Sequence, residues 1–244
     1  MQLIVIAGQA RVGKTTLAHL IAKKAFDMGL VPKLLSFAGP LKEMAKERGY
    51  SKEDNPEEYR KFCQDYGASK REEDPDYWID EFDKEIQIVK DEEYEDLESG
   101  KKYWERCVVV DDCRYPNEVD YGISQEGFLI FLSYGKRRMD DPKGDWRNHH
   151  SESMARLVDS GASPFRELFS CFIKNQGTLE EFEEKLEGMI PIWCGGDGPS
   201  GDRALSDEQY LDLNQAVSDL IDLLLLNDIE EEIDDEEDPD ESDP

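Results

Sequence analysis

The stretch Gly8-Gln9-Ala10-Arg11-Val12-Gly13-Lys14-Thr15 decides the fold. It follows the apolar run 3–7, which is typical of a buried strand, and it precedes residues 16–24, which have helical periodicity. Glycines let the backbone wrap closely around a phosphate, the N–H groups of the loop and helix N-terminus face the anion, and the lysine reaches its outer oxygens. The spacing therefore predicts a nucleotide phosphate-binding loop between a strand and a helix. An ordinary glycine turn is the alternative, but it does not account for the strand before and the helix after.

Two carboxylates follow a second apolar run. Asp111 and Asp112 come directly after residues 107–110, which are uniformly apolar, as expected of a central parallel strand. An acid at the carboxyl end of such a strand, together with the loop hydroxyl of Thr15, is the arrangement that holds Mg²⁺ in phosphate-binding-loop proteins. We therefore predict magnesium ligands at Thr15, Asp111 and Asp112, and a catalytic role for Lys14 and Asp111. A polar turn at the strand end is the alternative.

Alternating strand and helix patterns predict an α/β fold. We expect a three-layer α/β/α domain over residues 1–190, with a five-stranded parallel sheet and a charged surface insertion at 83–103. A loop and helix should follow at 191–227, and the apolar stripe of that helix either packs on the domain or forms a homodimer seam. The expected strands are 3–7, 32–37, 107–110, 128–132 and 170–173, and the expected helices are 16–24, 40–48, 55–66 and 178–189.

The charge of the chain restricts its partners. The 244 residues include 58 acidic and 29 basic side chains, for a net charge of −29, which argues against nonspecific nucleic-acid binding. Residues 228–244 carry twelve Asp or Glu and no Lys or Arg. This segment should be a disordered acidic tail that either contacts a basic partner or only keeps the protein soluble.

Several features predict a cytoplasmic protein. The sequence has no apolar run long enough for a membrane span and no secretory signal pattern. Its five cysteines are scattered and form no C-x-x-C pair, which favours reduced thiols.

A basic segment follows the fourth expected strand. Residues 134–150 are polar and include Lys136, Arg137 and Arg138, which we interpret as a lid. Closure of such a lid would bring guanidinium groups onto a transferred phosphoryl group and would exclude water. We therefore predict catalytic roles for Arg137 and Arg138. Solvated surface charges are the alternative.

Six further segments carry a resemblance to a known family. Residues 36–42, 64–68, 74–78, 110–118 and 150–152, together with Arg71, resemble the corresponding motifs of phage-type deoxynucleoside monophosphate kinases. The most specific of these motifs is Asp111-Asp112-Cys113-Arg114-Tyr115-Pro116-Asn117-Glu118, and the likeness spans residues 1–190. Gly39 stands where members of that family often have Asp.

The resemblance implies a reaction and its partners. It implies transfer of the γ-phosphate of ATP to a deoxynucleoside monophosphate, with Mg²⁺, in the cytoplasm of a phage-infected host. Arg71 and Arg114 would hold the acceptor phosphate, and Trp78 could stack on a base, although a tryptophan in an amphipathic stretch is more often a core residue. Two alternatives stay open: a kinase for another phosphorylated acceptor, of the dephospho-coenzyme A or phosphomevalonate type, and an ATP-dependent regulatory protein. The residues that we expect to bind ATP are Gly8, Gln9, Ala10, Arg11, Val12, Gly13, Lys14, Thr15 and Thr16. Those that we expect to bind the acceptor are Phe37, Lys42, Gln64, Arg71, Trp78 and Arg114.

Overall fold

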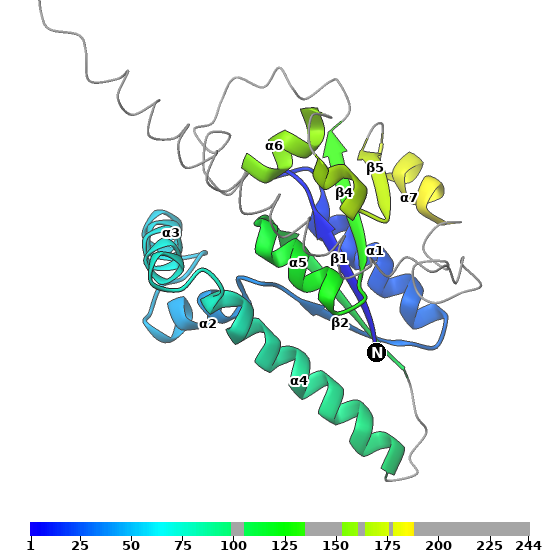
Figure 1. The fold of residues 1–244 in the computed structure, drawn as a ribbon, viewed down its shortest axis with the longest axis horizontal. Helices are drawn as coiled ribbons and strands as arrows, with labels where there is room; N and C mark the ends of the chain where they lie inside the picture. Colours follow the sequence, from blue (N-terminus) through cyan, green and yellow to red (C-terminus); the bar gives the residue numbers. More distant parts are fainter. Residues whose placement is uncertain (99–104, 135–152, 161–163, 176–177, 188–244) are drawn as a thin grey trace, which may run out of the picture. The chain divides into compact units, whose positions relative to one another are not determined.

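A parallel sheet forms the centre of the fold. The computed structural model describes residues 1–98, 105–134, 153–160, 164–175 and 178–187. The five strands are all parallel and lie in the order β2-β3-β1-β4-β5 (Figure 1). This arrangement confirms the expected α/β fold and five-stranded sheet. The strands are β1 (Gln2–Ala7), β2 (Val31–Leu35), β3 (Arg106–Cys113), β4 (Phe128–Tyr134) and β5 (Cys171–Asn175).

Helices cover both faces of the sheet. On one face, α1 and α7 pack against the inward side chains of β1, β3, β4 and β5. On the other face, α5 lies against β1 and β4, and α4 lies beside α5 (Figure 1). The helices are α1 (Lys14–Asp27), α2 (Gly39–Glu47), α3 (Pro56–Glu73), α4 (Tyr77–Glu98), α5 (Pro116–Ser124), α6 (Ser153–Ser160) and α7 (Leu179–Glu187), with a 3₁₀ turn η4 (Pro164–Leu168).

The sequence patterns explain these elements. Leu17, Ile21 and Ala25 repeat at intervals of four residues and form the buried stripe of α1. Ile4 and Ile6 alternate along β1 and face the same core cluster. The boundaries of these elements follow hydrophobic periodicity, which is why they lie close to the expected ones.

Several elements are longer than expected, and β3 and α3 differ most in what they position. β3 continues through Asp111 and Asp112 to Cys113 because its backbone still pairs with β1, where Ala7 lies opposite Cys113. α3 continues past Tyr66 and ends at Glu73, before Asp74 takes an extended conformation. Pro75 accounts for that end, since the residue before a proline is disfavoured in the helical region.

The segment expected to be a surface insertion is largely a core helix. Residues 83–98 belong to α4, and Phe82, Ile86 and Val89 on this helix are buried. The sequence interpretation was wrong here because the charged residues on the exposed face dominate the composition and obscure the i, i+4, i+7 apolar stripe. Residues 99–103 lie outside the described residues.

Other expectations also lie outside the described residues: the lid beyond residue 134 (135–150), the extension at 191–227 and the acidic tail at 228–244. Across the residues that the structure describes, none of the helices is long and apolar enough to cross a membrane.

Two isoleucines of α4 test its role in the core. Ile86 is 0% exposed and Ile88 is 60% exposed. We expect Ile86→Ala to lower the free energy of unfolding by about 2–5 kcal/mol, because it leaves a cavity in the core. The matched change Ile88→Ala should alter it by less than about 0.5 kcal/mol. Urea denaturation measures both values, and equal values would contradict the placement of this helix.

Candidate active site

The phosphate-binding loop occupies the turn between β1 and α1. The lysine of the loop is buried, and its Nζ donates hydrogen bonds to the carbonyl oxygens of Gly8 at 2.6 Å and Gln9 at 2.8 Å. The helix begins at Lys14 itself, so its first N–H groups lie at the loop. N–H groups at a helix N-terminus, which point along the helix axis, together with an ammonium group form a binding site for an anion such as a phosphate.

Glycine is required at two places in this loop. Gly8 has φ 143°, and a Cβ atom there would lie 2.1 Å from the carbonyl oxygen of Leu132 on β4. Gly13, the residue before the helix, has φ 100° and lies in the left-handed region. The loop therefore packs directly on the backbone of the neighbouring strand, which fixes its position.

Two side chains that sequence reasoning missed brace the loop. Asn175, at the end of β5, donates from Nδ2 to the carbonyl oxygen of Val12 at 2.8 Å. Asp159 on α6 accepts a hydrogen bond from Nε2 of Gln9 at 3.2 Å. A polar residue at the carboxyl end of a strand was a usable signal for Asn175, whereas nothing near Asp159 in the sequence marks its contact.

A hydroxyl and a carboxylate meet beside the loop. Thr15 Oγ1 donates a hydrogen bond of 2.6 Å to Asp111 Oδ2. Both groups are oxygen donors of the kind that Mg²⁺ prefers, and both are at the phosphate end of the loop. Within the described residues, no cluster of three or more His, Cys, Asp or Glu side chains could hold a metal ion alone. The pair therefore fits a magnesium ion that takes its other ligands from a nucleotide and water.

Asp112 does not share this arrangement. Its carboxylate accepts hydrogen bonds from the backbone N–H groups of Phe37 at 2.7 Å and Ala38 at 3.2 Å, and it forms an ion pair with Lys42 at 3.3 Å. The expectation that Asp112 is a metal ligand is therefore corrected, because both of its carboxylate oxygens already bind these donors and fasten the β2–α2 turn.

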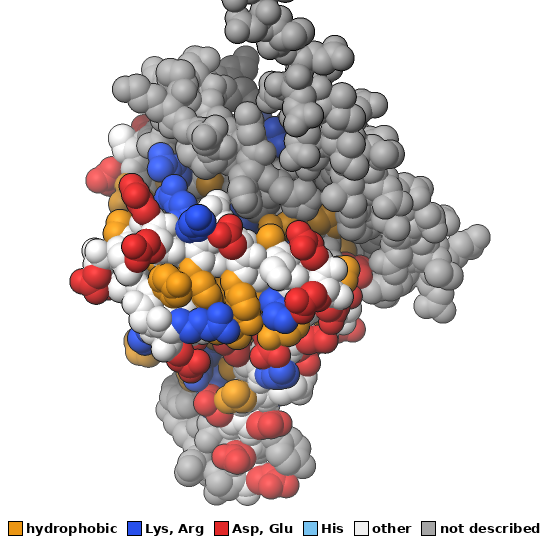
Figure 2. All heavy atoms as spheres, turned by 90° about the vertical axis from the view of Figure 1, so that its left-hand side faces the viewer, with side chains coloured by type: hydrophobic (Ala, Val, Ile, Leu, Met, Phe, Trp, Pro, Cys, Tyr) orange, Lys and Arg blue, Asp and Glu red, His pale blue; other side chains and the backbone are white. Residues whose placement is uncertain are grey.

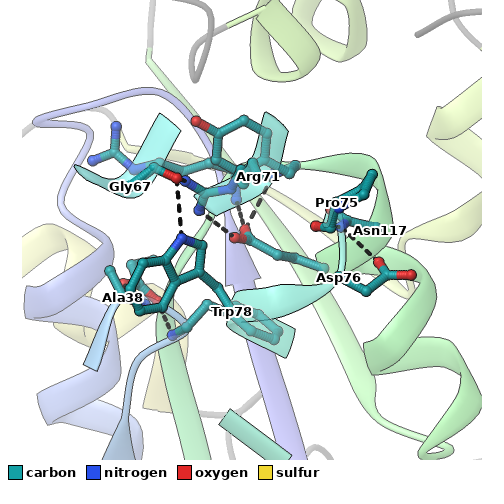
Figure 3. Close-up of polar contacts among 12 residues, drawn as sticks. Ala38, Gly67, Arg71, Pro75, Asp76, Trp78 and Asn117 are labelled. Carbon is teal, nitrogen blue, oxygen red and sulfur yellow. Dashed lines mark hydrogen bonds and ion pairs between the residues drawn. The ribbon is translucent and has the colours of Figure 1, made fainter. Parts of the chain in front are cut away.

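An arginine is held near the end of β3. The Arg71 guanidinium donates from Nη1 to the carbonyl oxygen of Gly67 at 3.3 Å, and its Nη2 lies 3.7 Å from Glu118 Oε1. The same guanidinium lies over the ring of Tyr115, 4.1 Å from the centroid. Figure 3 shows this group beside Gly67 and Trp78. The contacts restrict Arg71 to one region, beside the turn that carries Arg114.

Glu118 connects that turn to Arg71. Its Oε2 accepts hydrogen bonds from the backbone N–H groups of Arg114 at 2.7 Å and Tyr115 at 3.1 Å, which caps α5. Burial and the nearby charge of Asp112 raise the pKa of Glu118 to about 7, although Arg71 and the two N–H groups oppose this shift.

Two expected acceptor-binding residues are core residues. Trp78 is 2% exposed, and its Nε1 donates to the carbonyl oxygen of Gly67 at 3.1 Å (Figure 3). Phe37 is 1% exposed and packs against the ring of Phe82 with centroids 4.5 Å apart. Neither side chain is accessible to an acceptor, so the expected acceptor contact of Phe37 and base stacking of Trp78 are corrected, and the core interpretation of Trp78 is the one that the structure supports.

A cleft of about 380 Å³ lies next to the Thr15–Asp111 pair. Lys42 borders it and donates to Ser36 Oγ at 2.9 Å. Burial raises the pKa of Glu85 in the same cleft, and the charges of Glu43 and Asp112 add to the effect. The cleft is lined by Thr15, Ala18, His19, Leu34, Leu35, Ser36, Gly39, Lys42, Glu43, Glu85 and Asp111.

An aromatic stack joins α3 to the end of α2. The ring of Phe62 stacks on Tyr50 at 4.6 Å and on Tyr66 at 5.3 Å, and the Arg48 guanidinium lies 4.5 Å from the centroid of Tyr66. Figure 2 looks onto the side of the molecule that carries these helices, where apolar side chains are bordered by both acidic and basic ones. The stack holds α3 in place, and Arg71 with it.

Gln64, which we expected to bind the acceptor, is exposed on α3.

The basic residues assigned to the lid, Lys136, Arg137 and Arg138, lie outside the described residues.

Comparisons with known proteins give one family. A family described as an AAA domain matches residues 4–139, which include the loop and the end of β3. No curated protein matches the chain in sequence. Among solved structures, a shikimate kinase from Acinetobacter baumannii in complex with shikimate is 14% identical, over 78% of this chain and 93% of that one, with a TM-score of 0.35. A putative kinase from Chloroflexus aurantiacus is 16% identical, over 77% of this chain and 94% of that one, with a TM-score of 0.33.

The contact between α6 and the loop should depend on pH. Burial raises the pKa of Asp159 from 3.8 to about 6, and Lys174 opposes this shift. Because the folded state binds the proton more tightly than the unfolded state, Asp159 makes the wild type lose stability as pH rises from about 4 to about 6. Asp159→Asn can still accept the hydrogen bond from Gln9 and does not ionise.

We therefore expect Asp159→Asn to raise the Tm relative to wild type above pH 7, with a difference that disappears near pH 4. Differential scanning fluorimetry from pH 4 to pH 8 measures this difference. Asp54→Asn, at an exposed aspartate, is the control. A difference for Asp159→Asn that is constant with pH would contradict the assignment.

Proposed function

The chain belongs to the AAA domain family, and from this premise we propose that it is a deoxynucleoside monophosphate kinase. The reaction transfers the γ-phosphate of ATP to a deoxynucleoside monophosphate and releases the diphosphate and ADP. The observation that supports the proposal is that Glu118 joins the Arg71 guanidinium of α3 to the turn of Arg114, which follows β3, the strand paired with the one that leads into the Lys14 loop. A nucleotide hydrolase needs no second cationic group for an acceptor phosphate, but a nucleoside monophosphate kinase does.

The donor half consists of the loop and β3. Lys14 would exchange its hydrogen bonds with Gly8 and Gln9 for the outer phosphates of ATP. Thr15 and Asp111 would hold Mg²⁺, which would neutralise part of the charge on the phosphates. Lys14 and Thr15 begin the helix that follows β1, and Asp111 lies near the end of the adjacent strand β3, so the bound triphosphate would lie across the carboxyl edge of the sheet.

The acceptor half consists of α2, α3 and the β3–α5 turn. The Arg71 guanidinium provides planar, paired donors suited to a phosphate monoester. Lys42 and Glu85 line the cleft beside the Thr15–Asp111 pair, which offers space for the rest of the acceptor. The deoxyribose preference rests on the resemblance of residues 110–118 to the phage-type kinases.

Little proton transfer is needed in this reaction. The second pKa of a phosphate monoester is about 6, so the acceptor is largely a dianion at neutral pH and one of its oxygens can attack directly. The new bond forms between this oxygen and the γ-phosphorus as the bond from the γ-phosphorus to the β–γ bridging oxygen breaks. Positioning and charge neutralisation therefore supply most of the catalysis.

A coupled assay of ADP release tests the proposal. Mg-ATP is supplied with each deoxynucleoside monophosphate in turn, with the matching ribonucleotides, and with dephospho-coenzyme A and phosphomevalonate. We expect one or more deoxynucleotides to accelerate ADP release above the ATP-only rate. Acceleration by a different acceptor alone, or ATP binding without acceleration by any acceptor, would contradict the proposal and favour another kinase or a regulatory protein, respectively.

Lys14→Ala should abolish the transfer. We expect kcat/KM to fall at least about 100-fold, because the variant loses the ammonium group that neutralises the moving phosphoryl group. Lys23→Ala changes an exposed lysine of the same helix and should have little effect. Initial rates give kcat/KM for wild type and both variants, and equal Tm values show that all three are folded. Near-normal turnover by Lys14→Ala would show that the mechanism is wrong.

A further inference from the structure

A single buried carboxylate contacts both sides of the acceptor half. Glu118 is 3% exposed, lies in the first turn of α5, and reaches Arg71 on α3 with one oxygen and the turn N–H groups of Arg114 and Tyr115 with the other. We propose that Glu118 is a positioning residue that holds Arg71 and Arg114 together as one binding site for the phosphate group of the acceptor. The identity of this ligand rests on the proposed function.

The geometry restricts Arg71 from three directions. Glu118 lies on one side of the guanidinium, the Tyr115 ring lies against its face, and the carbonyl oxygen of Gly67 accepts from Nη1. Tyr115 is also held by Glu118 through its backbone N–H, so the carboxylate fixes two of the three contacts. A guanidinium held in this way loses less conformational entropy when it binds a phosphate.

Stability alone does not account for a carboxylate at this position. Burying a charge is costly, and well-packed apolar groups often replace a buried ion pair without loss. The groups that face Glu118 are Asp112 and Cys113 on β3, Arg71 on α3 and the Arg114 turn. Arg71 and the Arg114 turn supply the guanidinium groups that would bind the acceptor phosphate. A fixed orientation of these groups is useful for phosphate recognition.

The test compares two buried glutamates. Glu118→Gln keeps the size of the side chain, but one amide cannot accept from both N–H groups and also face the guanidinium, because its own N–H₂ is a donor. Glu93→Gln is the matched control. Glu93 is also buried, accepts from the N–H of Arg106 at 3.2 Å and pairs with the amino group of Met1 at 3.1 Å, at the amino ends of β1 and β3.

Inorganic phosphate is the probe for binding. Wild type and both variants are first saturated with a Mg-bound, non-hydrolysable ATP analogue, which also occupies the γ-phosphate position at the loop, and are then titrated with phosphate by calorimetry. KM values for ATP and for the best acceptor are measured on the same proteins. We expect Glu118→Gln to weaken phosphate binding and raise the acceptor KM about tenfold, with the KM for ATP within about twofold of wild type. Glu93→Gln should lower the Tm without changing either constant.

The sign of the change separates positioning from charge. If Glu118 acted only as a negative charge near the site, its removal would tighten phosphate binding, and that result would overturn the proposal. An unchanged Kd for phosphate, or no phosphate binding by wild type, would overturn it as well. A different outcome would separate the two proposals. If wild type binds phosphate more tightly than Glu118→Gln but phosphorylates no deoxynucleotide, the proposed function is contradicted and the role of Glu118 is still supported.

Discussion

The parallel pairing of β1 with β3 is the constraint on which the rest of the site depends. Val5 pairs with Val110 and Ala7 with Cys113, so the loop that follows β1 opens beside the polar end of β3. This register allows Thr15 on α1 to reach Asp111 within hydrogen-bond distance. Asp111 and Asp112 lie at an irregularity of this pairing, between the Val5–Val110 and Ala7–Cys113 pairs, and their carboxylates reach different elements.

The acidic residues of β3 and α5 each fasten a different element. Asp111 meets the phosphate-binding loop, Asp112 holds the β2–α2 turn, and Glu118 reaches α3. Three acidic residues that lie within one short sequence motif, residues 111–118, therefore contact different elements of the fold. Because the three elements are joined to one strand and the helix after it, the donor and acceptor halves of the proposed site share a common support.

Local patterns in the sequence were enough to predict the sheet and the loop. The loop needs glycines at positions that a spacing rule identifies, and the core strands are continuous apolar runs, so neither requires knowledge of distant contacts. Trp78, Phe37 and Asp112 were different. Whether an aromatic ring stacks on a ligand or fills the core, and which way a carboxylate points, depends on elements far away in the chain, here α3, α4 and the β2–α2 turn.

Under the proposed function, one edge of the sheet would hold a donor phosphate and an acceptor phosphate in line. The most direct measurement is the binding of adenosine and a deoxynucleoside joined by five phosphates, compared by calorimetry with ATP and with the monophosphate alone. We expect binding with one-to-one stoichiometry, tighter than that of either nucleotide and weakened by both Lys14→Ala and Arg71→Ala. Binding no tighter than that of ATP, or weakened by Lys14→Ala alone, would contradict this arrangement of the two phosphates.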